Sequence, residues 1–130
     1  MIYMIACEEG AGLSRNNALD TEQLTDAMYY ILLSLLVPRH GYGIMSYIER
    51  LTEGEVAIGP ATAYTLIKKL QDNDCIAPVA NDEGQEGQDR RKTYAITEKG
   101  RRLVAGEIER RSRMARHGQW ALQQAEEEQG

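Results

Sequence analysis

Short polar and cationic side chains gather on one face of the segment 60–74, PATAYTLIKKLQDND. They are Thr62, Tyr64, Thr65, Lys68 and Lys69. Threonine hydroxyls are short enough to hydrogen-bond the base edges in the major groove of a duplex, and a tyrosine hydroxyl can donate to a phosphate. The two lysines can neutralise backbone charge without reading sequence. These residue types therefore fit a helix that binds double-stranded DNA.

A second basic group, Arg90-Arg91-Lys92, lies just before a strand-like segment, where it can follow the flanking phosphates. The chain as a whole is acidic, with a net charge of −5 and a pI near 5.1, which by itself argues against a nucleic-acid partner. The charges are unevenly spread, because residues 1–89 carry 5 basic and 14 acidic residues and residues 90–116 carry 10 and 3. This distribution indicates a local footprint for an anionic partner; the alternative is a solvated helix face without one.

The first helix that the sequence predicts follows an N-terminal arm. Asp20 can cap its start, and Leu19 can pack on Leu24 as a hydrophobic staple. Apolar residues then recur at helical spacing until Pro38 ends the helix.

A turn at residues 40–43 leads to a second predicted helix over residues 44–51, and residues 55–58 can pair as a small strand. Pro60 opens the third helix at the position where its missing N–H costs nothing. The apolar stripe of this third helix consists of Ala63, Leu66, Ile67 and Leu70.

Two strands, over residues 75–77 and 93–96, are predicted around a polar loop, and Thr97-Glu98 caps a long last helix. Alternating spacings of four and three along that helix form a weak heptad seam, which predicts pairing with a second copy. The residues expected to carry this dimerisation are Val104, Ile108, Ala115 and Leu122, with Arg111 and Gly118 interrupting the seam.

Together these elements predict a mainly α fold with a small β-hairpin wing, a winged helix-turn-helix followed by a long C-terminal dimerisation helix. The expected division is an arm over residues 1–18, a DNA-binding domain over 19–97 and the dimerisation helix over 98–130.

Enzymatic chemistry has no support in the sequence, which contains no nucleophile–base pair, phosphate loop or metal-ligand spacing. We therefore expect no catalytic residues, no cofactor and no metal. His40 fits a turn residue bonded to the backbone, and Cys75 a small buried residue. The longest apolar run is about half of a membrane span, so a cytoplasmic location is expected.

Three spaced blocks, HGYGIMSYIERL, GPATAYTLIKKLQDNDCI and DRRKTYAITEKGRRL, resemble the PadR family of bacterial transcriptional regulators. The resemblance covers roughly residues 28–103. It implies a winged-helix homodimer that represses genes for detoxification, drug export or stress responses by binding a palindromic operator. It also implies release of the DNA by a small aromatic effector.

The sequence departs from the family pattern at three places. Ala61 and Ala63 replace a glycine and a larger apolar residue, and residues 73–75 replace an acidic-glycine-leucine run. The tip of the wing carries four acids where a basic, glycine-rich tip is usual. These acids are Asp82, Glu83, Glu86 and Asp89.

Several alternatives stay open at this point. The acidic wing tip and negative net charge are also the signature of a winged-helix interaction module that lacks sequence-specific DNA binding. Tyr64 and Tyr94 fit half-buried core positions as well as DNA contacts. Trp120 fits dimer packing or the lining of a ligand cavity. The last four arginines of the basic segment, Arg110, Arg111, Arg113 and Arg116, fit a solvated face that keeps the dimer helix soluble.

Overall fold

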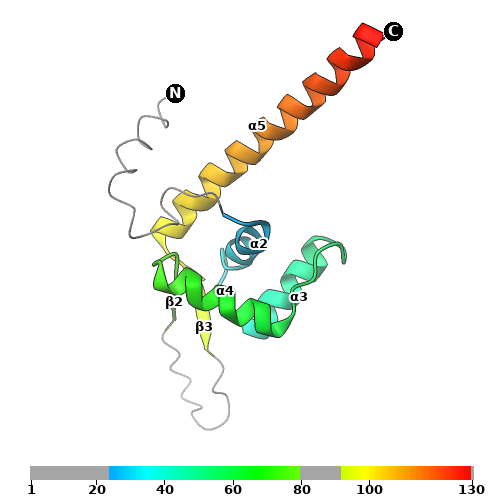
Figure 1. Cartoon of the computed structure of the whole chain (residues 1–130). Helices are drawn as coiled ribbons and strands as arrows, with labels where there is room; N and C mark the ends of the chain where they lie inside the picture. Colours follow the sequence, from blue (N-terminus) through cyan, green and yellow to red (C-terminus); the bar gives the residue numbers. More distant parts are fainter. Residues whose placement is uncertain (1–23, 80–91, 130) are drawn as a thin grey trace.

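Four helices and a three-stranded sheet make up the computed structural model over residues 24–79 and 92–129, the part of the chain that the structure describes (Figure 1). In order they are α2 (Asp26–Ser34), β1 (Arg39–His40), α3 (Gly41–Leu51), α4 (Pro60–Asp72), β2 (Ile76–Pro78), β3 (Thr93–Ile96) and α5 (Glu98–Gln129). The sheet order is β1-β3-β2 with both pairs antiparallel. This architecture confirms the predicted winged helix-turn-helix fold followed by a long C-terminal helix.

Helix α2 begins later than predicted. Thr25 has an extended backbone (φ −72°, ψ 164°), and its side-chain oxygen accepts a hydrogen bond from the Met28 N–H at 3.2 Å, so Thr25 is the N-cap. Asp20 lies outside the described residues, so its predicted capping role stays a prediction. The prediction of one continuous helix from Asp20 past Thr25 is wrong, because the backbone of Thr25 is extended. Leu24 is nevertheless buried, as its place in the apolar pattern predicts.

The third strand of the sheet is not where the sequence predicts it. Arg39–His40 pairs with β3, and β2 occupies the other edge of β3, so no free edge of β3 remains for residues 55–58. Those residues form a loop, in which the Val56 N–H donates to the Thr52 hydroxyl oxygen at 3.0 Å. The predicted turn at 40–43 is instead the first turn of α3, with His40 as its N-cap.

Helix α4 and the wing strands agree with the sequence. Gly59 is the N-cap of α4 and Pro60 occupies its first position. Its buried face is formed by Ala63, Ile67 and Leu70. Strand β2 pairs with β3 in the register Ile76↔Ile96, Ala77↔Ala95 and Pro78↔Tyr94.

The start of α5 is fixed against the wing. The Thr97 hydroxyl oxygen caps the helix by accepting from the Gly100 N–H at 3.1 Å. Gly100 is buried against the Cys75 carbonyl, and a Cβ at this position would overlap that oxygen. Beyond this anchored start, α5 continues as a single rod that projects away from the rest of the fold (Figure 1).

The core lies between α2, α3, α4, the sheet and the first turns of α5. Its largest fully buried apolar side chains are Met28, Ile31, Leu32, Leu35, Ile44, Ile48, Ile67, Leu70 and Ile76. Cys75 is buried as predicted, and Tyr94 is a core residue at 8% exposure. Val104, predicted to face a second copy, is 5% exposed within its own chain. That prediction is wrong because the side chain is already part of the core.

Candidate nucleic-acid interface

The outer face of α4 carries the five polar residues singled out from the sequence. Thr62, Tyr64, Thr65, Lys68 and Lys69 are all exposed. The opposite face is anchored in the core by Ala63, Ile67 and Leu70, which fixes the rotation of the helix about its axis. The structure therefore brings these five side chains together on one rigid, solvent-facing surface, which we call the α4 face.

The first turn of α4 has backbone donors that its own helix does not use. Gly59 provides no side-chain cap, and the first intrahelical bond runs from the Ala63 N–H to the Gly59 carbonyl at 2.8 Å. The N–H groups before Ala63 point out of the start of the helix, where the helix dipole favours an anion. This end of α4 can therefore accept a phosphate next to the two threonines.

Tyr64 is held in place by a glycine of the neighbouring helix. Its ring and hydroxyl lie over Gly41, where a Cβ would overlap both. The side chain is still 49% exposed, so one side of the ring packs on α3 and the other faces solvent. Tyr64 therefore packs against α3 while about half of its surface stays exposed on the α4 face.

Two residues at this junction were missed at the sequence level. Gly41 was interpreted as part of a turn and of the family-like block HGYGIMSYIERL, but not as a packing position, although the close approach of Tyr64 is what requires it. Tyr42 follows it in the first turn of α3 with 68% of its surface exposed. The sequence signal for this position is the Gly41-Tyr42 pair directly after a residue that can cap a helix, His40. His40 uses its Nδ1 to accept from the Gly43 N–H at 3.3 Å, which confirms its predicted backbone-bonded role.

Lys68 already has an acidic neighbour. Its Nζ lies 3.2 Å from a carboxylate oxygen of Asp72, one turn further along α4. Both side chains are largely exposed, at 76% and 62%. Exposed pairs of this kind contribute only ~0.3–0.5 kcal/mol, so a DNA phosphate can replace the Asp72 carboxylate at little cost.

Only one of the three predicted basic residues of the wing can be placed. Lys92 is exposed immediately before β3. Arg90, Arg91 and the acidic residues of the wing tip lie outside the described residues. The predicted role of the wing therefore stays a prediction.

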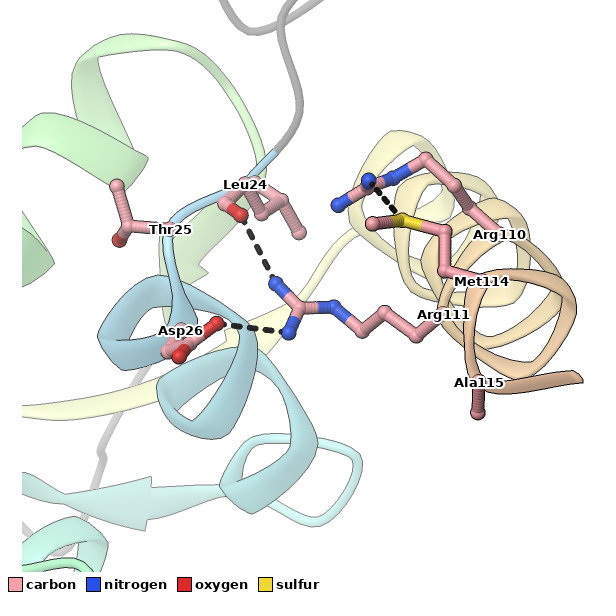
Figure 2. Close-up of a pocket in the computed structure, with 7 residues that line it drawn as sticks. All are labelled: Leu24, Thr25, Asp26, Arg110, Arg111, Met114 and Ala115. Carbon is pink, nitrogen blue, oxygen red and sulfur yellow. Dashed lines mark hydrogen bonds and ion pairs between the residues drawn. The ribbon is translucent and has the colours of Figure 1, made fainter. Parts of the chain in front are cut away.

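A network of ion pairs joins α5 to the start of α2. The Glu107 carboxylate is buried, with only 7% of its side chain exposed, and accepts from Arg110 at 2.9 Å and from Arg111 at 2.7 Å. Arg111 also donates to Asp26 at 2.8 Å and to the Leu24 carbonyl at 2.9 Å. Figure 2 shows its guanidinium bridging from α5 to both groups. We call these five residues the α2–α5 clasp.

The clasp shifts the titration of its members. Burial acts to raise the pKa of Glu107, but hydrogen bonds and charges from Arg110 and Arg111 outweigh it, so the pKa lies below its usual value. Burial likewise acts to lower the pKa of Arg111, and bonds to Asp26 and Glu107 raise it instead. The view that Arg110 and Arg111 merely solvate a dimer helix is wrong, because both are bonded within the chain.

Beside the clasp is an open cleft of about 630 Å³ between the start of α2 and the middle of α5 (Figure 2). Its lining residues are Leu24, Thr25, Asp26, Arg110, Arg111, Met114 and Ala115. Within the described part of the chain, no three His, Cys, Asp or Glu side chains are grouped as metal ligands. No helix over these residues is long and apolar enough to cross a membrane.

The fold and the α4 face define the class of a winged-helix protein, and comparisons with known proteins define its family. Residues 31–106 match the model of the transcriptional regulator PadR-like family. This match spans more than half of the chain, so the protein belongs to that family. The family consists of transcriptional regulators, which confirms that the chain is not an enzyme.

Solved structures of transcriptional regulators share the fold. A transcriptional regulator from Clostridium thermocellum is 23% identical, with a TM-score of 0.58 over 72% of this chain and 92% of its own. A PadR family regulator from Eggerthella lenta is 21% identical, with a TM-score of 0.58 over 93% and 94%. Bacillus subtilis PadR in complex with operator DNA is 24% identical, with a TM-score of 0.53 over 63% and 46%. No curated protein matched the sequence.

Proposed function

We propose that this protein is a sequence-specific DNA-binding regulator that acts as a homodimeric repressor in the cytoplasm. The observation that carries the proposal is the α4 face, where five side chains suited to bases and phosphates are exposed on a helix fixed from behind by the core. Family membership supports it, as does the fold shared with a Bacillus subtilis protein in complex with operator DNA.

In the proposed complex, α4 lies in the major groove with its first turn toward the bases. Thr62 and Thr65 contact base edges, and Tyr64 donates to a phosphate or lies against a sugar. Lys68 and Lys69 contact the backbone and fix the register of the helix. Arg90, Arg91 and Lys92 follow the flanking phosphates from the wing.

A homodimer would place two α4 helices in successive major grooves of a palindromic operator, about 34–36 Å apart. A small aromatic effector that binds the dimer with another spacing would release the DNA. The cleft beside the α2–α5 clasp has room for such a molecule. It lies where α5 meets the DNA-binding domain, so an occupant there would change the angle between them.

The proposal is tested by measuring binding of the purified protein to a fragment of its own upstream region, with unrelated DNA as competitor. Saturable binding that survives the competitor supports a sequence-specific regulator. Equal and weak binding to every fragment, with little dependence on salt, would instead support the interaction module that the acidic wing tip suggests. A panel of genomic fragments covers the case of a distant operator.

A further inference from the structure

Met114 is the exposed methionine of the cleft beside the α2–α5 clasp. Its side chain projects from α5 and lines the cleft, and 55% of the residue's surface is exposed (Figure 2). Among the other methionines that the structure describes, Met28 is buried at 2% exposure and Met45 is half-buried. A dissolved oxidant therefore reaches the sulfur of Met114 more readily than the sulfur of either of these two residues.

One side of this sulfur is occupied by a fixed cation. Nη1 of Arg110 donates to the Met114 sulfur at 3.0 Å (Figure 2). The rest of the guanidinium is held by the Glu107 carboxylate, which accepts from Nε at 3.1 Å and from Nη2 at 2.9 Å. Because these two bonds fix the plane of the guanidinium, Nη1 is held against one lone pair of the sulfur. A thioether sulfur has two lone pairs, so the second stays open.

The contact between Arg110 and Met114 joins unequal partners. A guanidinium is a strong, charged donor, whereas a thioether sulfur is a weak acceptor. Oxidation to the sulfoxide converts this apolar side chain into a polar one, with an oxygen that is a much better acceptor. One added oxygen atom at Met114 therefore changes the bonding of Arg110, a member of the α2–α5 clasp.

We propose that Met114 is an oxidation site at which a peroxide delivers oxygen to the sulfur lone pair that Arg110 leaves open, and that the product loosens the α2–α5 clasp. In this reaction the sulfur attacks one peroxide oxygen, so that an S–O bond forms as the O–O bond breaks. The proton on the transferred oxygen passes to the leaving oxygen, which departs as water when the oxidant is hydrogen peroxide. The sulfur loses two electrons and the peroxide gains them.

Oxidation reverses the polarity of the contact with Arg110. The sulfur of a sulfoxide is positively polarised, and its oxygen carries the negative charge. Because the oxygen enters on the open side, the positive sulfur is left facing the charged Nη1 of Arg110, 3.0 Å away. The oxygen can accept from Nη1 only if the Met114 side chain turns or the guanidinium leaves Glu107. Either movement disturbs the contact that joins α5 to the start of α2.

This inference goes beyond the proposed effector, because it needs no bound ligand. The cleft lies where α5 meets the DNA-binding domain, so in the proposed regulator the oxidation state of Met114 would act on DNA binding from that junction. The change is reversible, since methionine sulfoxide reductases return the sulfoxide to the thioether. Met114 would thus be an oxidant-responsive position of the protein.

The site is tested by treating the full chain with hydrogen peroxide and measuring oxidation of each methionine by peptide mass spectrometry. Met114 should oxidise about tenfold faster than Met45 and Met28, in keeping with its greater exposure. Equal rates at Met114 and Met45 would overturn the assignment of the site.

The configuration of the product tests the role of Arg110, because each of the two methionine sulfoxide reductases repairs only one sulfoxide epimer. After oxidation of the folded wild type and digestion to peptides, one reductase should repair most of the oxidised Met114 and the other little. Folded Arg110→Gln should give the two epimers in nearly equal amounts. Wild type oxidised in concentrated urea should do the same, which supplies the reference without any substitution. Equal epimers from the folded wild type would overturn the proposal.

Met114→Leu is the matched control for the effect on the clasp, because leucine keeps an apolar side chain without the sulfur. Peroxide should lower the midpoint of thermal unfolding of the wild type by about 2–4 °C more than that of Met114→Leu, as expected for the loss of one exposed contact in a small protein. Equal shifts in the two proteins would overturn the coupling to the clasp.

Binding to DNA separates this inference from the proposed function. Peroxide should weaken DNA binding by the wild type about fivefold more than binding by Met114→Leu, a factor typical of coupling between two sites. If the untreated protein bound no DNA, the proposed function would fail, and the epimer ratio and the unfolding midpoint would still decide this inference.

Discussion

The α4 face and the distal half of α5, residues 112–129, are both largely exposed, but they differ in what lies behind them. The α4 face is the outer side of a helix whose inner side is buried in the core, so one chain alone holds its side chains in position. The distal half of α5 continues beyond the α2–α5 clasp and projects away from the rest of the fold (Figure 1). The proposed DNA-binding surface is therefore complete in one protomer, whereas the distal half of α5 packs on little of the described part of its own chain.

Breaking the α2–α5 clasp should cause the largest loss of stability, because the clasp is where α5 is joined to the DNA-binding domain. Glu107→Gln leaves Arg110 and Arg111 without the buried charge they share. We expect a loss of about 2–3 kcal/mol in the free energy of unfolding, less than for a fully buried pair because both arginines are partly exposed. Urea denaturation measures the loss.

The same variant carries a pH signature. The pKa of Glu107 in the folded state lies below its usual value of about 4.5, so its charge stabilises the fold above that pH. The wild type should lose this contribution as the pH falls through the folded-state pKa. The free energy of unfolding of Glu107→Gln should therefore fall less in acid than that of the wild type. If the two proteins lost stability equally as the pH falls, the charge of Glu107 would not stabilise the fold, which would contradict the proposed role of the clasp.

A smaller effect is expected where α3 supports the α4 face. Gly41→Ala places a Cβ against the ring and hydroxyl of Tyr64, which should cost about 1–2 kcal/mol of stability and displace the tyrosine from the α4 face. DNA affinity should fall with it. Thermal unfolding and DNA titration measure the two changes.

Gly43→Ala is the matched control for that substitution. It lies in the same helical turn, and its Cβ would meet Arg39 at an ordinary 3.6 Å, so it should be neutral or slightly stabilising. Adding Tyr64→Ala to Gly41→Ala should recover stability but not DNA affinity. If Gly41→Ala and Gly43→Ala behaved alike, the packing of Tyr64 on Gly41 would not be what positions the tyrosine.

The smallest change in stability is expected at the end of the α4 face. Asp72→Asn removes the exposed partner of Lys68 and should change the free energy of unfolding by less than about 0.5 kcal/mol. It should nevertheless tighten DNA binding, because a negative charge beside the phosphates is lost. Glu109→Gln, at an exposed position on α5, is the control for the charge alone, and weaker binding by Asp72→Asn would contradict the placement of Lys68.

The parts of the fold with local signals could be predicted from the sequence. Pro60 at the start of α4 and Thr97 at the start of α5 are capping features that act within one turn. The polar side of α4 follows from helical spacing alone, which is why its five residues were found. The wing strands were found because alternation and flanking polar residues mark them locally.

The parts that were missed depend on contacts distant in sequence. Strand β1 has two residues, and only the open edge of β3 defines it. The clasp joins positions 83 and 87 residues apart, in the bonds from Leu24 to Glu107 and from Arg111 to Leu24. The spacing of Val104 fits a position in a heptad seam as well as a position in the core, and only its burial within its own chain decides between them.

The most direct test of the central claim, that the α4 face binds DNA, is the salt dependence of affinity for Lys68→Ala/Lys69→Ala. Each phosphate contact contributes about 0.9 to the slope of log affinity against log salt, so losing two should flatten the slope by about 1.8. Lys68→Arg/Lys69→Arg keeps both charges and should keep the wild-type slope. An unchanged slope in the alanine variant would show that DNA, if bound, is held by another surface.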